Sequence, residues 1–443
     1  MRRSRADTIA TLTAVRLHPR AMTKSLFLAA LVGGALTLAA SAMTAPQPRA
    51  GRRLSTVIVS AGALDRTNTI VRFALPPGTR GEHLQLRILD DDRQDVPPRD
   101  RQDTVSLQIS RDRQASFILP SLRAGETRRY QLEPALAVTD ATPLVQAREE
   151  RQGVGIGLDW TPVLRYQAEK GELPDETLKP ILRRGGYIHP VRTPRGRVVT
   201  DDYPPGQPHH HGIWAAWTRT AFQGRAPDFW NMADGTGTVE FENLLETWSG
   251  HTHAGFSARH RYVDLGATPP VTVLTEVWTV SVYGIAGAPA PYRMFDIDIR
   301  QDLATASPLG LPPYHYGGLG VRGRREWAEA GGARFLTSEG KDRASANATR
   351  ARWCYIGGLV DGALAGLVIL GHPSNERAPQ PVRVHPTEPY FTFAPQQAGR
   401  MELTPGQPYV MKYRVLAIDG PPDKTLIDRV WQDYADPVSV RIE

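Results

Sequence analysis

The stretch RMFDIDIRQDL, residues 293–303, alternates apolar and charged side chains. In a β-strand, Asp296 and Asp298 would point to one face, away from the apolar residues that alternate with them. A period of two residues is typical of a half-buried antiparallel strand. This stretch therefore predicts a sheet with one face in an apolar core.

Comparable segments rich in β-branched and aromatic residues lie on both sides of this stretch. They occupy residues 239–248, 257–265, 271–280, 351–360, 363–370, 390–395 and 409–418. The chain has no alternation of strands and helices, no glycine-rich phosphate loop and no tandem repeat. We expect a mostly β protein with a larger antiparallel β-sandwich or supersandwich domain over residues 154–443. One helix is predicted, at 423–434, with Asp423 as its N-cap.

A second group of short alternating segments precedes this region. These segments are residues 56–62, 69–76, 83–90, 105–110, 115–120 and 128–134, separated by Pro, Gly and Asp. Strands at intervals of about 8–15 residues with such turns predict a small β-sandwich domain, at 52–137. The polar stretch 138–153 is expected to be a linker.

The N-terminus has the pattern of an export signal. Lys24 precedes the apolar run 25–40, which ends in the small residues Ala40-Ser41-Ala42. This pattern predicts a signal peptide over residues 1–42, and the run is too short and too rich in Gly and Ala for a typical membrane span. We expect a periplasmic or secreted protein. The alternative is an uncleaved segment that anchors the chain in the membrane.

The charge and the cysteine count exclude some classes of protein. The net charge of +7 rests on 53 basic and 46 acidic residues. Residues 1–42 hold six of the basic and one of the acidic residues, which leaves 47 against 45, or +2. No basic stripe with interleaved aromatics remains, so we expect no nucleic-acid partner. The single cysteine, Cys354, lies in a strand-like run and is expected to be a small buried residue.

The segment 186–230 carries the residues best suited to chemistry. It is long, loop-like and rich in His, Asp and Trp, as binding and catalytic loops on β scaffolds often are. If the triplet His209-His210-His211 enters a strand, His209 and His211 face the same way, roughly 7 Å apart. Two such imidazoles could bind a divalent metal or act as general acid or base near neutral pH. A cupin-like metal site would need a carboxylate shortly afterwards, and residues 212–216 contain none.

Aromatic and polar residues near the triplet fit a sugar site. Tryptophan faces stack on sugar rings while polar groups bind hydroxyls. The residues concerned are Trp214, Trp217, Asp228, Phe229, Trp230 and Asn231. Two later segments are expected to form rims of the same pocket, and they hold His315, Tyr316, Arg322, His372, Asn375 and Arg377.

Carboxylates are plentiful on the strand-like segments, among them Glu240, Glu242, Glu246, Glu276, Asp296 and Asp298. Two carboxylates about 5–10 Å apart could cleave a glycosidic bond. Sequence alone does not show which two approach each other.

The strings at 189–214, 228–230, 314–322, 372–383 and 411–420 resemble, in this order, a bacterial family catalogued as PmoA-like, or "methane oxygenase PmoA". The family is an exported or cytoplasmic β-sandwich group of unsettled activity, common beside sugar-catabolic genes. The resemblance implies pocket residues His189, Arg192, Asp202, His209, His210, His211, Asp228, Trp230, Tyr316, Gly317, Gly318, Arg322, His372, Asn375 and Arg377.

The family name does not imply methane oxidation. The membrane monooxygenase subunit of that name is a multi-helix protein, and no segment after residue 42 could supply its helices. A copper histidine brace would need histidine as the first mature residue, whereas the predicted cleavage leaves Met43. The chain also departs from the family in having Thr238-Val239-Glu240 where the pattern tends to a histidine.

Together these features predict an enzyme that cleaves or isomerises a glycoside or modified sugar. His209 or His211 is the expected general acid or base, and Asp228 or Glu276 its carboxylate partner. The pocket residues His189, Arg192, Asp202, His210, Trp214, Trp230, His315, Tyr316, Arg322, His372, Asn375 and Arg377 are expected to bind substrate. The alternatives are a non-catalytic sugar-binding sandwich and a metal-dependent lyase or oxygenase with His209 and His211 as ligands.

Overall fold

The computed structural model describes residues 55–81, 83–89, 104–135, 144–285, 292–328 and 332–443. The predicted signal peptide lies outside these ranges, as do residues 138–143 of the predicted linker. The fold is mostly β and is built from antiparallel sheets, as expected from the alternating pattern.

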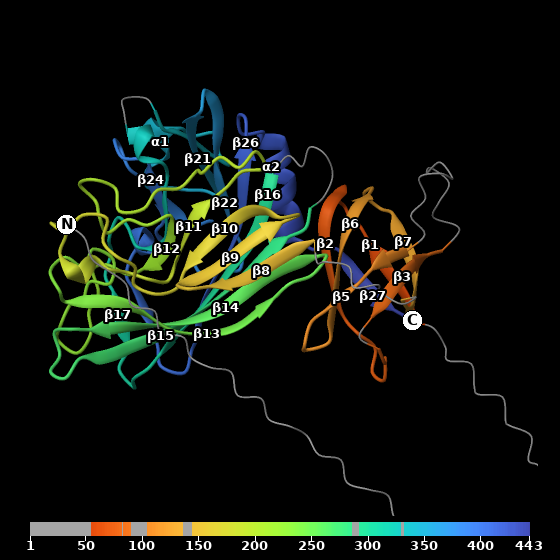
Figure 1. Ribbon diagram of the computed structural model, residues 1–443, viewed down its shortest axis with the longest axis horizontal. Coiled ribbons are helices and arrows are strands. Elements are labelled where there is room, and N and C mark those ends of the chain that lie inside the picture. Colours follow the sequence, from red (N-terminus) through yellow and green to blue (C-terminus); the bar gives the residue numbers. More distant parts are fainter. Residues whose placement is uncertain (1–54, 82, 90–103, 136–143, 286–291, 329–331) are drawn as a thin grey trace, which may run out of the picture. The chain divides into compact units, whose positions relative to one another are not determined.

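Two large sheets hold most of the strand residues that the structure describes (Figure 1). The nine-stranded sheet has the order β20 (Thr349–Arg350), β23 (Pro381–Val384), β24 (Tyr390–Phe393), β18 (Gly318–Arg322), β12 (Ile213–Ala216), β11 (Tyr187–Val191), β10 (Thr161–Gln167), β9 (Gly153–Leu158) and β8 (Val145–Glu150). The eight-stranded sheet has the order β13 (Gly237–Trp248), β14 (His253–Asp264), β15 (Val271–Tyr283), β16 (Tyr292–Leu303), β26 (Tyr409–Asp419), β22 (Ala363–Gly371), β21 (Trp353–Val360) and β19 (Arg334–Thr337).

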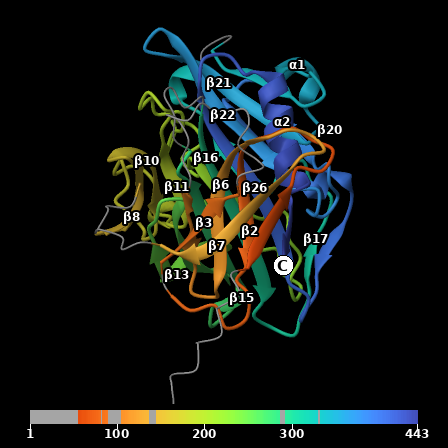
Figure 2. The same ribbon diagram turned by 90° about the vertical axis from the view of Figure 1, so that its right-hand side faces the viewer.

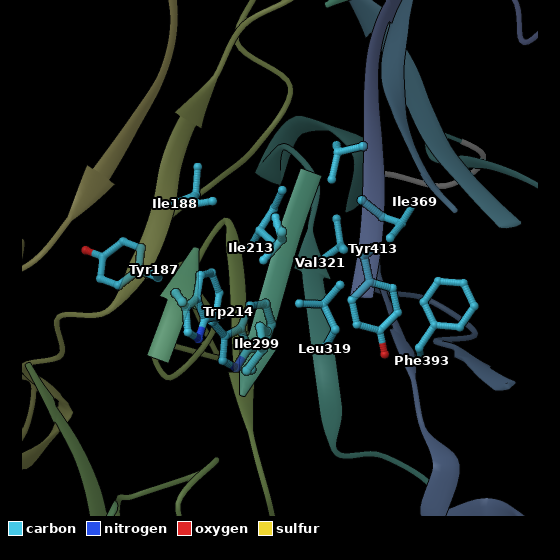
Figure 3. Packing of buried hydrophobic residues seen from close by; sticks show 14 of the residues in the cluster. Tyr187, Ile188, Ile213, Trp214, Ile299, Leu319, Val321, Ile369, Phe393 and Tyr413 are labelled. Atoms are coloured by element: carbon cyan, nitrogen blue, oxygen red, sulfur yellow. The ribbon is translucent and has the colours of Figure 1, made fainter. Parts of the chain in front are cut away.

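The main core draws apolar residues from both of these sheets. Figure 3 shows Ile213 of β12 and Val321 of β18 close to Ile299 of β16 and Tyr413 of β26. Each fully buried side chain of this size stabilises the fold by about 1.5–3 kcal/mol. Strand β16 faces this core with its apolar residues, as its alternation predicted.

The two aspartates of β16 both lie on the opposite face, but only one is exposed. Asp298 is exposed, whereas Asp296 is buried and accepts two hydrogen bonds from the Arg414 guanidinium of β26, at 2.8 and 3.0 Å. Helix α2 (Lys424–Ala435) packs on this face, against β21, β22 and β26, as Figure 2 shows. Its N-cap is Asp423, whose carboxylate accepts from two backbone N–H groups, as predicted.

A five-stranded and a three-stranded sheet share a separate core. Their orders are β27 (Ser439–Ile442), β1 (Thr56–Ser60), β7 (Thr127–Pro134), β3 (Leu84–Ile88), β4 (Thr104–Ser106), and β2 (Arg66–Ala74), β6 (Gln114–Leu122), β5 (Gln108–Ile109). The core holds Val57, Val59 and Phe117. The last strand, β27, pairs with β1, so the C-terminus of the chain completes the sheet of its N-terminal strands.

The remaining elements are short. They are the two-stranded sheet of β17 (Leu309–Leu311) and β25 (Met401–Leu403), helix α1 (Arg343–Ala346), and the 3-10 helices η3 (Pro180–Leu182), η4 (Arg325–Ala328) and η5 (Pro395–Ala398). Cys354 of β21 is fully buried, as predicted, and burial raises the pKa of its thiol. Within the described ranges, every helix is too short or too polar to cross a membrane.

Candidate active site

The connection between β11 and β12 places the histidine triplet. Strand β12 begins only at Ile213, so the triplet lies in the loop before the strand rather than in it. Gly212 follows the triplet where the chain passes close to β11, and a Cβ at this position would lie 2.2 Å from the backbone oxygen of Ile188. Glycine permits this approach. The close crossing fixes His211 against the first residues of β11.

His211 is paired with a carboxylate. Its Nδ1 lies 2.6 Å from Asp202 Oδ1, while Tyr187 donates its hydroxyl to Asp202 Oδ2 at 2.7 Å. The His211 ring stacks on Tyr187 with 4.4 Å between ring centroids and meets the edge of Tyr203 at 4.8 Å. Asp202 is therefore the carboxylate partner of His211, a role that the sequence pattern assigned to Asp228 or Glu276.

The protonation of this pair follows from its surroundings. Burial lowers the pKa of His211, and the interaction with Asp202 offsets this only in part. Burial alone would raise the pKa of Asp202, but His211 reverses this, and the pKa lies below its usual value. Near neutral pH the pair is thus a carboxylate beside a neutral imidazole. The hydrogen bond assigns the imidazole proton to Nδ1, which leaves the lone pair on Nε2.

His211 Nε2 is the free end of this arrangement. It is buried and has no hydrogen-bond partner among the described residues. Buried polar atoms are almost always hydrogen-bonded. It is therefore unusual that Nε2 has no partner while Nδ1 of the same ring is bound to a carboxylate. The same geometry orients the base of serine hydrolase triads.

His209 and His210 lie next to this pair. Their rings meet edge to face at 4.5 Å, and His210 packs between Trp214 and Tyr390. Burial, followed by the charge of His211, lowers the pKa of His209 to about 4. Burial likewise holds the pKa of His210 well below its usual value. All three histidines are therefore neutral near pH 7.

Tryptophans form an aromatic wall beside the histidines. The rings of Trp214 and Trp230 lie 4.7 Å apart, and Tyr316 follows at 5.5 Å from Trp230. The indole N–H groups of Trp214 and Trp230 are buried and find no acceptor in the described part of the chain. With His211 Nε2, the region thus holds two unpaired donors and one unpaired acceptor, a set suited to hydroxyl groups.

Asp228 holds the aromatic wall in place. Its Oδ1 accepts from the backbone N–H groups of Trp230 and Asn231, and its Oδ2 accepts from the Asn231 amide at 2.6 Å. Tyr316 donates to Asn231 Oδ1 at 3.1 Å, which ties the wall to the segment before β18. Asp228 thus has a positioning role, and its charge also acts on His209, although no hydrogen bond joins the two.

Arg322, at the end of β18, braces the other side of the triplet. Its guanidinium donates to Gln207 Oε1 at 2.8 Å and to Glu388 Oε2 at 2.9 Å, and it lies 3.5 Å from His210 Nδ1. The Arg322 side chain is only 1% exposed. It holds the loop that carries the histidines.

His189 joins the site, whereas Arg192 does not. His189 Nδ1 lies 2.9 Å from Thr200 Oγ1, and the charge of Asp202 acts on its imidazole. Arg192 donates to the backbone oxygen of Gly196 and lines a different cavity, above β8 to β10.

Other residues predicted for the site form hydrogen bonds and packing contacts that stabilise the fold. Asn375 bonds both backbone groups of Lys412, and Arg377 donates to the backbone oxygens of Pro395, Gly399 and Arg400. His372 bonds Ser374 and packs on Tyr434 of α2. His315 is exposed, and its ring contacts Tyr316 at the outer edge of the aromatic wall. The sequence pattern predicted that these polar residues at strand ends form the rim of the pocket. In the structure most of them form hydrogen bonds with backbone groups of turns.

Glu276 lies inside the main core. Its carboxylate accepts from Trp278 Nε1 and Gln301 Nε2, both at 2.7 Å, and from the Tyr262 hydroxyl at 2.9 Å, with His260 Nδ1 at 3.1 Å. Its lone pairs are used by these four neighbours. This carboxylate therefore stabilises a polar network between the sheets, and the structure does not bring it to His209 or His211 as a partner.

Sequence reasoning missed four residues of the site. Two of them, Tyr187 and Tyr203, lie in the segment 186–230, but tyrosine has no spacing signal that separates a site from a core. Glu388 and Tyr390, which contact Arg322 and His210, come from a distant strand end, so only the fold brings them here.

The histidines have few partners for a metal ion. Across the described ranges, no group of three or more His, Cys, Asp or Glu side chains could hold one. His209 and His211 would need a third ligand from elsewhere.

Fold and site together define a β-sandwich protein with an interior histidine–aspartate pair beside a tryptophan wall. Residues 154–432 match a family described as a family of unknown function, DUF6807, and the chain belongs to it. The match contains every residue of the site. No curated protein matches the chain in a sequence search.

Proposed function

We propose that the chain is a carbohydrate-active enzyme in which His211 Nε2 acts as a general base. The observation that carries this proposal is the contrast between the two nitrogens of one buried ring. Nδ1 is bound to Asp202, while Nε2 has no partner among the described residues. A neutral imidazole with one nitrogen fixed is ready to accept a proton on the other.

The chemistry of this pair favours proton transfer. Nε2 takes a proton from a sugar hydroxyl, or from a carbon next to a carbonyl, and Asp202 stabilises the imidazolium that forms. In an isomerisation the proton then returns to the neighbouring carbon of the same sugar. In an elimination the bond from the next carbon to its oxygen substituent breaks, and the proton goes to the oxygen that leaves. Hydrolysis by two carboxylates has less support, since Asp228 and Glu276 are both engaged in hydrogen bonds.

The class of substrate follows from the aromatic wall. Trp214 and Trp230 are fully buried, and their apolar rings and unpaired N–H donors lie in the same place. A sugar presents apolar ring faces and hydroxyl acceptors together, so it fits both features. This wall is also what favours the second candidate, a non-catalytic sugar-binding sandwich.

Turnover assays with a panel of glycosides, aldoses, ketoses and modified sugars test the proposal. For a substrate found with the wild type, His211→Gln should lower kcat by about 10²-fold or more, the usual contribution of a general base. The exposed His251 provides the matched control, and His251→Gln should leave kcat unchanged within about threefold. Unchanged turnover in a folded His211→Gln protein would contradict the proposal. Sugar binding without turnover would favour the binding protein.

We also propose that the protein is exported and acts in the periplasm or the medium. The support is the signal pattern of residues 1–42. Mass spectrometry of the protein recovered from a cell envelope extract or the medium should give Met43 as the first residue. Recovery of the uncleaved chain from membranes would support the anchor alternative, and recovery from the cytoplasm would contradict export.

A further inference from the structure

A cavity on the outer face of the nine-stranded sheet lies apart from the histidine site. It has a volume of about 270 Å³ and lies above β8, β9 and β10. Its floor and walls include Gly155, Gly157, Trp160, Arg148 and Arg165. None of these residues takes part in the site around His211. We call this cavity the β8–β10 trough.

Strand β9 contributes no side chain to the floor of the trough because of its sequence. Its residues GVGIGL, 153–158, alternate glycine with apolar residues, and the apolar residues are buried in the main core. The outward positions of β9 are therefore all glycine. Because the Glu150 carboxylate covers Gly155, a flat ring could lie directly against the backbone at Gly157.

The walls of the trough come from the two neighbouring strands. In the sheet register, Arg148 of β8 pairs with Gly155, which in turn pairs with Arg165 of β10. Paired residues point to the same face, so two arginines flank a glycine. The strands that carry them are about 9.5–10 Å apart, and the Glu150 carboxylate, which Arg165 binds, lies between them over Gly155.

The charge of the trough is positive. Arg148, Arg165 and Arg192 line it together with one carboxylate, Glu150. Arg165 donates to Glu150 at 2.7 Å, which leaves the charges of Arg148 and Arg192 without a carboxylate among the lining residues. An anionic ligand would supply the missing charge.

Trp160 closes one end of the trough and is 67% exposed. It sits in the two-residue turn between β9 and β10, where Asp159 and Trp160 have φ values of 47° and 63°. A left-handed backbone at a tryptophan costs about 1 kcal/mol or more, and glycine or asparagine would be the usual choice. The Arg148 guanidinium lies 4.9 Å from the centre of the indole ring.

We propose that the β8–β10 trough binds an acidic saccharide, a chain of sugar rings that carry carboxylates. Trp160 stacks on one sugar ring, and the glycine floor lets that ring approach the backbone. Arg148 and Arg192 bind the carboxylates of the saccharide. A neutral saccharide would use the same floor and indole but leave the arginines without a counter-charge. The proposal is independent of the chemistry at His211.

Calorimetry with galacturonic acid trimer, beside the neutral galactose trimer, tests this proposal. The wild type should bind the acidic trimer at least tenfold more tightly than the neutral one, and higher salt should weaken the binding. Trp160→Ala and Arg148→Ala should each raise Kd at least fivefold. The exposed Arg123, on the turn after β6, gives a control with the same charge change, and Arg123→Ala should leave Kd unchanged.

A substitution that fills the trough provides a second, independent variant. A Cβ at Gly157 would meet only the backbone of Thr161, at 3.3 Å, and its φ is not in the left-handed region. In Gly157→Val the Thr161 backbone must shift by a few tenths of an ångström, and the folded variant should lose binding of the acidic trimer.

The outcomes separate the two sites. Loss of binding in Trp160→Ala and Gly157→Val, with full binding in His211→Gln, supports the trough. Binding that disappears in His211→Gln but persists in Trp160→Ala overturns it and places the sugar at the histidines instead. Equal affinity for the acidic and neutral trimers, or none for the acidic one, also overturns it.

Discussion

Asp202 Oδ1 lies 2.6 Å from His211 Nδ1, and this contact determines which nitrogen of the imidazole is free. The Tyr187 hydroxyl holds the other carboxylate oxygen and so fixes the plane of the acid. With Nδ1 held in this way, Nε2 is the nitrogen of His211 that has no partner among the described residues.

Replacement of the carboxylate should disable the base without removing the site. In Asp202→Asn the amide no longer favours a proton on Nδ1, and the imidazolium loses its partner. We expect kcat to fall by about 10²–10⁴-fold with a smaller change in KM. Steady-state kinetics beside Asp234→Asn, an exposed control, measure this effect. A change confined to KM would assign Asp202 to substrate binding instead.

The stability of the protein should depend on pH through His209. Its pKa is about 4 in the folded chain against about 6.5 in the unfolded one. As the pH falls below about 6.5, the unfolded state takes up a proton that the folded state does not, so the free energy of unfolding falls. Between pH 7.5 and 5.0 the loss due to His209 should be about 2 kcal/mol.

Urea unfolding at these two pH values measures this loss. The loss should be smaller by at least about that amount in His209→Gln, since the charge of His209 also lowers the pKa of His210 after burial. Carboxylates with lowered pKa values, such as Asp202, titrate below this window. An identical pH dependence of the two proteins would show that His209 keeps an ordinary pKa.

The buried pair of Asp296 and Arg414 should matter for stability and not for the site. In Asp296→Ala, Arg414 would remain buried without its carboxylate, which costs about 3–5 kcal/mol. Asp298 lies two residues further along the same strand and is exposed, so Asp298→Ala should change the free energy of unfolding by less than about 0.5 kcal/mol. Denaturant titration of both variants compares them directly, and equal effects would contradict the role given to Asp296.

Glu276 should prove to be a stabilising residue. In Glu276→Gln an amide N–H₂ group would replace one carboxylate oxygen and face either the donor Trp278 or the donors Tyr262 and Gln301, at a cost of about 2–3 kcal/mol. Turnover by the folded fraction should stay within about threefold of the wild type. If Glu276→Gln were as stable as the wild type and lost activity about 100-fold, the result would support the catalytic role predicted for Glu276 from the sequence.

Periodicity accounts for the parts of the fold that the sequence predicted. Alternation of apolar and polar residues identified β16 and its neighbours, because one face of each strand meets the core. The helix from 424 was found because its apolar spacing and its cap, Asp423, are both local. The pairing of β27 with β1 joins the two ends of the chain, and no local pattern encodes such a contact.

The site was predicted only in outline. The segment 186–230 was identified as its source, and His211, Trp214 and Trp230 lie there together. The partner of His211 was not predicted, because Asp202 and Glu276 are both plausible carboxylates until the fold shows which one the ring meets. The sequence could not show whether Arg377 and Asn375 bind a ligand or the backbone, because the same residue types donate hydrogen bonds to both.

The protonation of the His211 ring tests the central claim most directly. Nitrogen-15 NMR of labelled protein at pH 7, with the His211 signals assigned by their loss in His211→Gln, reports the state of each ring nitrogen. The structure predicts a neutral ring with the proton on Nδ1 and a free lone pair on Nε2. A proton on Nε2, or a charged imidazolium at pH 7, would contradict the proposed general base.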